Sequence, residues 1–179
     1  SACLVGSEMC IRDRVTFEGK TFSLFHDCIK NPSLALNRSD VLSSFKGNAG
    51  IVKISDKKAF AIKMETHNTP SQLEPIHGAA TGVTGVVRDV MAVGQGAKPT
   101  ATWNALYLDS PSSLVVDGIA HGGNQLGLPT ISGNLSFHPC FQVKPLVFAG
   151  AISEIELPIS SGKDTVSYTH LTLPTKRIV

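Results

Sequence analysis

Residues 49–66 contain two apolar runs separated by a short polar turn, and a long glycine-containing run follows them. The runs "AGIVKIS" and "AFAIKMET" predict strands at about 49–55 and 59–66, because apolar and polar residues alternate between turn residues. The segment from Gly78 to Gly94 places valines at helical spacing and predicts a helix. Two strands and a helix in this order restrict the fold to a sheet with helices packed on it.

The rest of the chain extends this pattern. Ser110 and Pro111 are typical of a helix N-cap and first helical position. The order of elements predicts an α+β fold, a mixed β-sheet with helices on one face. The other predicted elements are a short helix near 33–45, a strand at 98–108, a helix from Ser110 to about 126, and strands near 130–137 and 145–154.

Composition excludes several classes of protein. The chain is 42% hydrophobic and 17% charged, which is typical of a globular protein. No uncharged apolar run approaches the roughly 18 to 20 residues that a membrane span needs. A net charge of +2 is too small to indicate a nucleic-acid-binding protein. We therefore expect neither a membrane nor a nucleic acid as partner. Away from the ends, only Cys28 and Cys140 remain, which indicates reduced thiols in a cytoplasmic protein.

The two ends carry a pattern unrelated to folding. "MCIRD" at residues 9–13 can be encoded by DNA whose reverse complement encodes "VSYTH", residues 166–170. Such an inverted repeat is typical of sequencing adapters, so we expect residues 1–14 and 166–179 to be adapter-derived. Without these ends, acidic and basic residues balance. We expect the chain to be a fragment of a longer protein.

Polar side chains collect at the end of the second predicted strand. A period of two places Lys63, Glu65 and His67 on one face of this strand. A lysine can bind phosphate oxygens, a carboxylate can bind magnesium and a histidine can transfer protons. The alternative is a solvated strand face that ends in a turn. Spacing alone leaves both interpretations open and favours the solvated face.

A charged pair, Arg88 and Asp89, interrupts the predicted helix. Arginine can bind a phosphate or carboxylate through two N–H groups, and the aspartate can be a second magnesium ligand. The alternative is that both project into solvent or pair with neighbours. The preceding "HGAATGVTG" could bring backbone N–H groups to a phosphate, but it matches neither the P-loop nor the dinucleotide motif.

The segment "KMETHNTPSQLEPIHGAATGVTGVVRD" resembles the signature of the phosphoribosylformylglycinamidine synthase family, within the aminoimidazole ribonucleotide synthetase superfamily. "GNAGIV", "GQGAKP" and "GGNQLGLPTISGNLSFHPCFQVKPLVFAGAI" extend the likeness over about residues 47–153. The resemblance implies that residues 15–154 are the N-terminal domain, incomplete at its start. In this family its sheet pairs with a second copy to form a barrel. Residues 155–165 would begin the missing C-terminal domain.

The reaction that the resemblance implies converts formylglycinamide ribonucleotide, ATP and glutamine-derived ammonia to formylglycinamidine ribonucleotide, ADP and phosphate through an iminophosphate. Implied partners are a glutaminase domain or subunit, and a second half or homodimer partner. The fragment alone is expected to be inactive. Two alternatives remain: a non-catalytic nucleotide-binding paralogue, and a small-molecule kinase of the same superfamily.

The resemblance also assigns roles to residues. Lys63 would contact ATP, and Glu65 and Asp89 would hold Mg²⁺. His67 is a candidate catalytic residue, and His26 is a second one by rough position only. At Thr69 much of the family carries a second histidine, and a threonine hydroxyl cannot accept a proton at neutral pH as an imidazole can. The implied substrate-binding residues are Thr66, His67, Asn68, Thr69 and Arg88.

Overall fold

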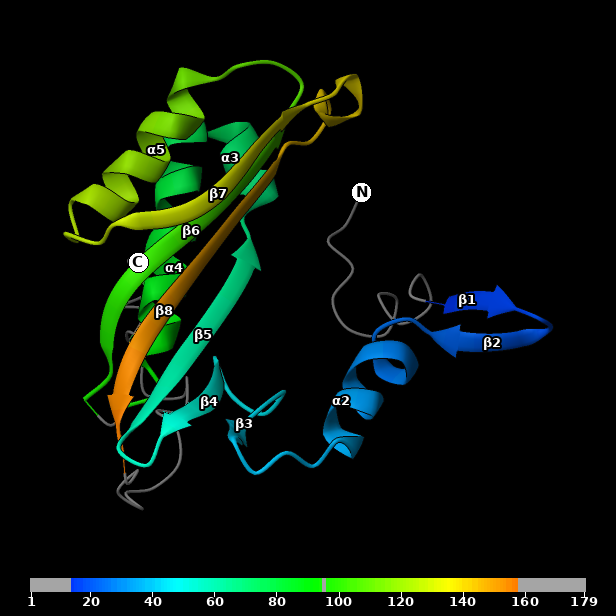
Figure 1. The fold of residues 1–179 in the computed structure, drawn as a ribbon. Helices are drawn as coiled ribbons and strands as arrows, with labels where there is room; N and C mark the ends of the chain where they lie inside the picture. The colour runs from blue at the N-terminus through cyan, green and yellow to red at the C-terminus, as the bar shows by residue number, and fades with distance from the viewer. Residues whose placement is uncertain (1–13, 95, 158–179) are drawn as a thin grey trace, which may run out of the picture.

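The computed structural model describes residues 14–94 and 96–157. Most of these residues form one sheet with helices packed on it (Figure 1). In chain order the elements are β1 (Arg14–Phe17), β2 (Lys20–Ser23), η1 (His26–Lys30), α2 (Asn31–Ala35), β3 (Val41–Ser43), β4 (Gly50–Ser55), β5 (Lys58–Thr66), α3 (Asn68–Leu73), α4 (Pro75–Met91), β6 (Lys98–Leu108), α5 (Ser113–Asn124), β7 (Thr130–Phe137), η2 (Pro139–Phe141) and β8 (Leu146–Glu156).

The main sheet has six strands in the order β3-β4-β5-β8-β6-β7. Strand β8, the last in the chain, inserts between β5 and β6 and is antiparallel to both. Strands β6 and β7 are parallel, because α5 makes the crossover between them. The sheet is therefore mixed, and the predicted α+β fold class is confirmed.

Helices α3, α4 and α5 lie on one face of the sheet (Figure 1). Under α4 the strands carry small residues such as Ala61 and Ala151, and the helix supplies valines such as Val83 and Val86, all fully buried. Small residues on the sheet let the helix backbone approach closely and fill the layer without voids. Helix α5 packs on α4 equally closely, since a Cβ at Gly118 would lie 2.4 Å from the Ile76 carbonyl oxygen.

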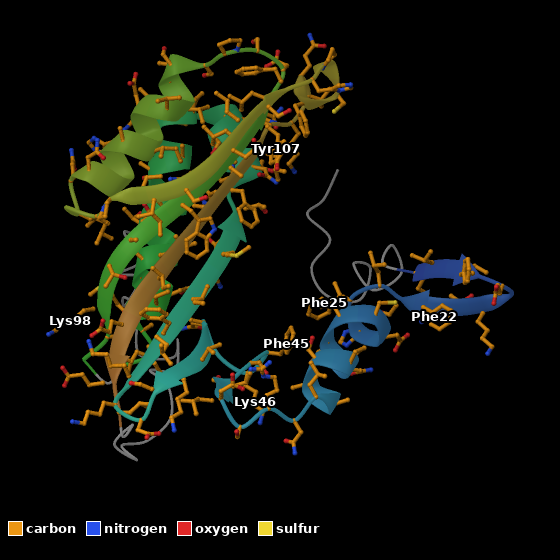
Figure 2. All side chains as sticks on the ribbon, in the orientation of Figure 1. Phe22, Phe25, Phe45, Lys46, Lys98 and Tyr107 are labelled. Carbon is orange, nitrogen blue, oxygen red and sulfur yellow. The ribbon has the colours of Figure 1, made fainter. Side chains whose placement is uncertain are left out.

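The opposite face of the sheet carries larger apolar side chains and no helix among the described residues. Met64 on β5 is 52% exposed, and Tyr107 projects from β6 (Figure 2). Trp103 lies against Gly150 of the neighbouring strand, where a Cβ would overlap the indole ring. An exposed apolar face of this kind is typical of an interaction surface. That a second copy covers it to form a barrel stays a prediction.

The N-terminal segment differs from the expectation. Residues 14–48 contain no buried residue, and β1, β2 and α2 stand apart from the main sheet (Figure 1). The short helix expected near 33–45 lies earlier, as α2 and the preceding turn η1. The β1–β2 hairpin was not expected, because its four-residue strands are too short to show a pattern. Its turn places Glu18 and Gly19 at positive φ.

The start of α5 is a second correction. The N-cap is Ser112, not Ser110, and its hydroxyl oxygen accepts a hydrogen bond from the backbone N–H of Val115 at 3.4 Å. Serine is a favourable N-cap residue at either position, so residue type alone could not show which of the two caps the helix. In the described part of the chain, no helix is long and apolar enough to cross a membrane.

Candidate functional site

The polar face of β5 is the covered face of the sheet. Lys63 and Glu65 alternate with Ile62 and Met64, as predicted, but they lie on the side that α4 covers. The side chains of Lys63 and Glu65 are 25% and 37% exposed, and that of Asp89 on α4 is 9% exposed. The interpretation as a solvated strand face is therefore wrong for these residues.

Two glycines of α4 make room for this polar face. A Cβ at Gly85 would lie 3.5 Å from Oε1 of Glu65, and a Cβ at Gly82 would lie 2.9 Å from Cβ of His67. The helix runs antiparallel to β5, so successive turns meet successive residues of the strand face. Larger residues at these positions would separate the helix from Glu65 and His67. The glycines that weaken helix propensity are explained by this close approach.

Lys63 joins the two carboxylates. Its Nζ atom lies 2.8 Å from Oδ2 of Asp89 and 3.7 Å from Oε2 of Glu65. A buried carboxylate needs a cationic partner, because desolvation disfavours the isolated charge. Residues from β5 and α4 that are 24 or more positions apart thus form one ionic cluster, and the predicted grouping of Lys63, Glu65 and Asp89 is found.

His67 extends the same face towards the N-terminal end of α4. Its Nδ1 atom lies 2.6 Å from the carbonyl oxygen of Gly78. A carbonyl oxygen only accepts hydrogen bonds, so Nδ1 carries the proton in this contact. In the neutral ring, Nε2 is then the nitrogen with the free lone pair. The contact fixes both the orientation of the imidazole and the atom that can accept a proton.

Backbone and side-chain hydrogen bonds hold the turn that carries His67. Its N–H donates to the carbonyl oxygen of Val147 at 2.8 Å, and the Val147 N–H donates to Oδ1 of Asn68 at 2.9 Å. Asn68 thus continues the β5–β8 ladder with its side chain. The hydroxyl of Ser71, which is buried, donates to the His67 carbonyl oxygen at 2.5 Å.

Ser71 was not singled out from the sequence, and Gly78 was noted only as part of the glycine-rich stretch "HGAATGVTG". Their roles depend on contacts between a helix turn and a strand end, which no local pattern reveals. The structure explains why position 78 is glycine: a Cβ there would lie 2.4 Å from the Pro70 carbonyl carbon.

The remaining predicted residues lie around this cluster or away from it. Thr69, which follows Asn68 in the chain, and Arg88, which precedes Asp89, are both exposed, and strand alternation places Thr66 on the opposite face from His67. His26 lies in η1, where its ring packs edge-on against Phe25 at 5.3 Å. Phe25 in turn contacts Phe45 (Figure 2). The described contacts do not join His26 to Lys63 or to any other residue of the cluster.

The donor set fits magnesium better than a transition metal. No group of three or more histidine, cysteine, aspartate or glutamate side chains suited to a metal ion occurs in residues 14–94 and 96–157. Magnesium typically takes one or two protein carboxylates and completes its shell with water and substrate phosphates. Glu65 and Asp89 offer two such carboxylates around one cationic position. The cluster can therefore bind a cation together with a phosphate group.

Comparison with known proteins places this chain in a family. Residues 46–155 match the family "AIR synthase related protein, N-terminal domain". Because this match covers more than half of the chain, the chain belongs to that family. The resemblance found in the sequence is confirmed, down to the type of relative: PurL, a subunit of phosphoribosylformylglycinamidine synthase.

The curated relatives named phosphoribosylformylglycinamidine synthase subunit PurL include proteins from Deinococcus radiodurans and Thermotoga maritima. The protein from Deinococcus radiodurans is 49% identical over 108 residues, which is 56% of this chain and 14% of that protein. The protein from Thermotoga maritima is 44% identical over 105 residues, which is 59% of this chain and 17% of that protein. The chain thus spans less than a fifth of the length of these relatives.

Solved structures of PurL are also similar to this chain. T. maritima PurL complexed with ATP matches with a TM-score of 0.59 at 40% identity, over 65% of this chain and 20% of that one. The complex with FGAR gives the same TM-score and identity, over 19% of that chain. Thiamine monophosphate kinase from Aquifex aeolicus matches with a TM-score of 0.51 at 16% identity, which shows a shared fold alone.

Proposed function

We propose that the chain is part of an ATP-dependent ligase of purine biosynthesis that converts formylglycinamide ribonucleotide to formylglycinamidine ribonucleotide. The observation that carries the proposal is the ionic cluster of Lys63, Glu65 and Asp89, with His67 directly after the end of the same strand and against the same helix. Relatives named for this synthase, and structures of a PurL with ATP and with FGAR, support it.

The cluster supplies what phosphoryl transfer requires. Such reactions depend on positioning and on the neutralisation of phosphate charge, and little covalent help comes from the protein. In this proposal Glu65 and Asp89 hold Mg²⁺, and Lys63 binds a phosphate of ATP. The bound metal would supply positive charge at the phosphate oxygens. All three residues lie on β5 and α4, so the backbone positions from which their side chains extend are fixed by the scaffold.

His67 and its neighbours bind the ribonucleotide in this proposal. The Nε2 atom of His67 is the proton acceptor, because Nδ1 donates to the Gly78 carbonyl oxygen. The Oδ1 atom of Asn68 accepts from Val147, which leaves the amide N–H groups for the substrate. Thr69 and Arg88 are exposed and adjoin Asn68 and Asp89 in the chain, and in this proposal they contact phosphate or ribose oxygens. Thr66 and His26 are the least supported members of the site.

The overall reaction follows from the chemistry of the amide. ATP transfers its γ-phosphoryl group to the amide oxygen, which forms an iminophosphate and ADP. Ammonia then attacks the imidate carbon, and phosphate leaves with the C–O bond electrons. The ammonia comes from a glutaminase domain or subunit, and a second sheet of the same type covers the open face. The parent protein is cytoplasmic, and the present fragment has no activity of its own.

A second candidate is a nucleotide-binding paralogue without turnover, which Thr69 favours because the second histidine of many relatives is missing. One experiment separates the two. The full-length parent is purified and ADP formation is measured with formylglycinamide ribonucleotide, ATP and ammonium chloride. ADP formation that requires both ammonia and the ribonucleotide supports the ligase. Nucleotide binding by a folded parent without ADP formation supports the paralogue.

A further inference from the structure

The ammonium of Lys63 lies between the same two carboxylates that the proposed function assigns to magnesium. It is 2.8 Å from Asp89 and 3.7 Å from Glu65. We propose that Lys63 takes the place of the metal in the free protein, and that it moves to the nucleotide phosphates when Mg²⁺ binds Glu65 and Asp89. This inference rests on the proposed function and adds an internal cation that exchanges with the metal.

The burial of Asp89 is the first argument. Its side chain is 9% exposed, and an ionised carboxylate at such a position is stable only with a compensating charge. Glu65 adds a second negative charge beside the same ammonium. The free protein therefore needs a cation here before any ligand binds, and Lys63 supplies one from the adjacent strand.

Geometry makes the two cations compete. Magnesium binds oxygen at about 2.0–2.1 Å, so it would occupy the space next to Asp89 in which Nζ of Lys63 now lies. Two cations in contact with the same oxygens also repel each other. Lysine has a flexible four-carbon stem, and a quarter of the Lys63 side chain already reaches solvent. It can therefore leave the carboxylates without a change in the backbone.

This competition couples metal binding to nucleotide binding. Magnesium alone must displace an existing ion pair, so its net gain is small. Magnesium with a nucleotide offers the released ammonium a phosphate partner, so both cations keep an anion. A ligand stabilises a protein only as far as it binds the folded state. Magnesium alone is therefore expected to stabilise this chain little.

The test uses thermal unfolding of the 179-residue chain with saturating MgCl₂, or with NaCl at matched ionic strength to remove general screening. Four proteins are compared: wild type, Lys63→Met, Lys63→Arg, and Lys63→Met combined with Asp89→Asn. We expect Lys63→Met to have a lower Tm than wild type in NaCl and to gain several degrees in MgCl₂. Wild type and Lys63→Arg, which keep a cation, should change little. The double variant, which lacks the carboxylate, should lose the magnesium effect.

Each result decides for or against the exchange. Equal magnesium shifts in wild type and Lys63→Met would overturn it, as would no shift in any of the four proteins. If Lys63→Met does not fold in NaCl, circular dichroism in MgCl₂ provides the readout: recovery of the folded spectrum supports the exchange, and its absence overturns it. Failure of the proposed function gives a different result. In that case the full-length parent forms no ADP that depends on ammonia, whether or not magnesium stabilises the variants.

Discussion

The Nδ1 atom of His67 lies 2.6 Å from the carbonyl oxygen of Gly78, so a strand end and a helix turn together determine where the imidazole proton resides. This relationship ties the chemistry of His67 to a residue eleven positions further along the chain.

The first prediction concerns the tautomer of His67. In the neutral ring we expect the proton on Nδ1, because the Gly78 carbonyl can only accept. Long-range ¹H–¹⁵N correlation spectra of the imidazole distinguish the two nitrogens. His138 is an internal control with the opposite expectation, because its Nδ1 accepts from the N–H of Cys140 at 3.2 Å. A protonated Nε2 in neutral His67 would contradict the assignment.

Gly82 is predicted to be essential for the approach of α4 to His67. An alanine Cβ there would lie 2.9 Å from the His67 Cβ, and overpacking of this kind typically costs about 1–3 kcal/mol. The helix propensity of alanine returns up to about 1 kcal/mol. We expect Gly82→Ala to lower the free energy of unfolding in urea and to shift the His67 resonances.

Gly123→Ala is the matched control for this change. Its Cβ would meet only Val83, at 3.9 Å, which is an ordinary contact. It should leave the unfolding free energy unchanged or slightly higher. Similar losses in both variants would show that the Gly82 effect is not specific to His67.

The open face of the sheet is predicted to mediate association with a second sheet. Met64 lies on this face and is 52% exposed. If a second copy covers the face, Met64→Glu should weaken self-association of the chain in sedimentation equilibrium, because a buried charge at an interface is unfavourable. Leu73→Glu, at a residue that is 78% exposed at the end of α3, should have no effect. Equal association of both variants would rule out this face as the interface.

The pair of Lys58 and Glu154 joins β5 to β8 at 2.6 Å and gives a pH prediction. The hydrogen bond from Lys58 to Glu154 and the opposite charge raise the pKa of Lys58 above its ordinary value of 10.5. A raised folded-state pKa stabilises the protein below the unfolded value, and this contribution is lost as pH rises through the folded value. Glu154→Gln should therefore lower urea stability slightly at neutral pH.

At a pH above the raised pKa of Lys58, the same substitution should have no effect. The side chains of Lys58 and Glu154 are 54% and 35% exposed, so the difference at neutral pH is small and should shrink with salt. A difference between wild type and Glu154→Gln that grows with pH would contradict this account.

Much of the fold could be predicted from sequence, because β4, β5, β6, β7, β8 and α4 each have a clear period. Which face of β5 the helix covers could not be predicted. Alternation shows that Lys63 and Glu65 share a side, but not that α4 packs on that side while Met64 lies on the open one. The answer depends on the glycines of α4, which accept polar side chains without a clash.

The site was predictable where its residues are adjacent in the signature and less so elsewhere. Lys63, Glu65 and Asp89 were grouped through the resemblance, and the ion pairs now join them. Ser71 and the Gly78 carbonyl hold His67 in place through contacts with backbone atoms. Such contacts cannot be recognised from composition or residue spacing. His26 lies in a segment without a buried residue, so its own packing does not fix its position relative to the cluster.

The most direct test is the rate of ammonia-dependent ADP formation by the full-length parent with Glu65→Gln or Asp89→Asn. Each substitution keeps the shape of the side chain and removes one negative charge from the proposed metal and phosphate site. We expect each to lower kcat by roughly 100-fold or more, as loss of a group that stabilises charge in the transition state does. His77→Gln, on the outer surface of α4, should retain the wild-type rate. Wild-type rates in both carboxylate variants would contradict the assignment of this cluster as the catalytic centre.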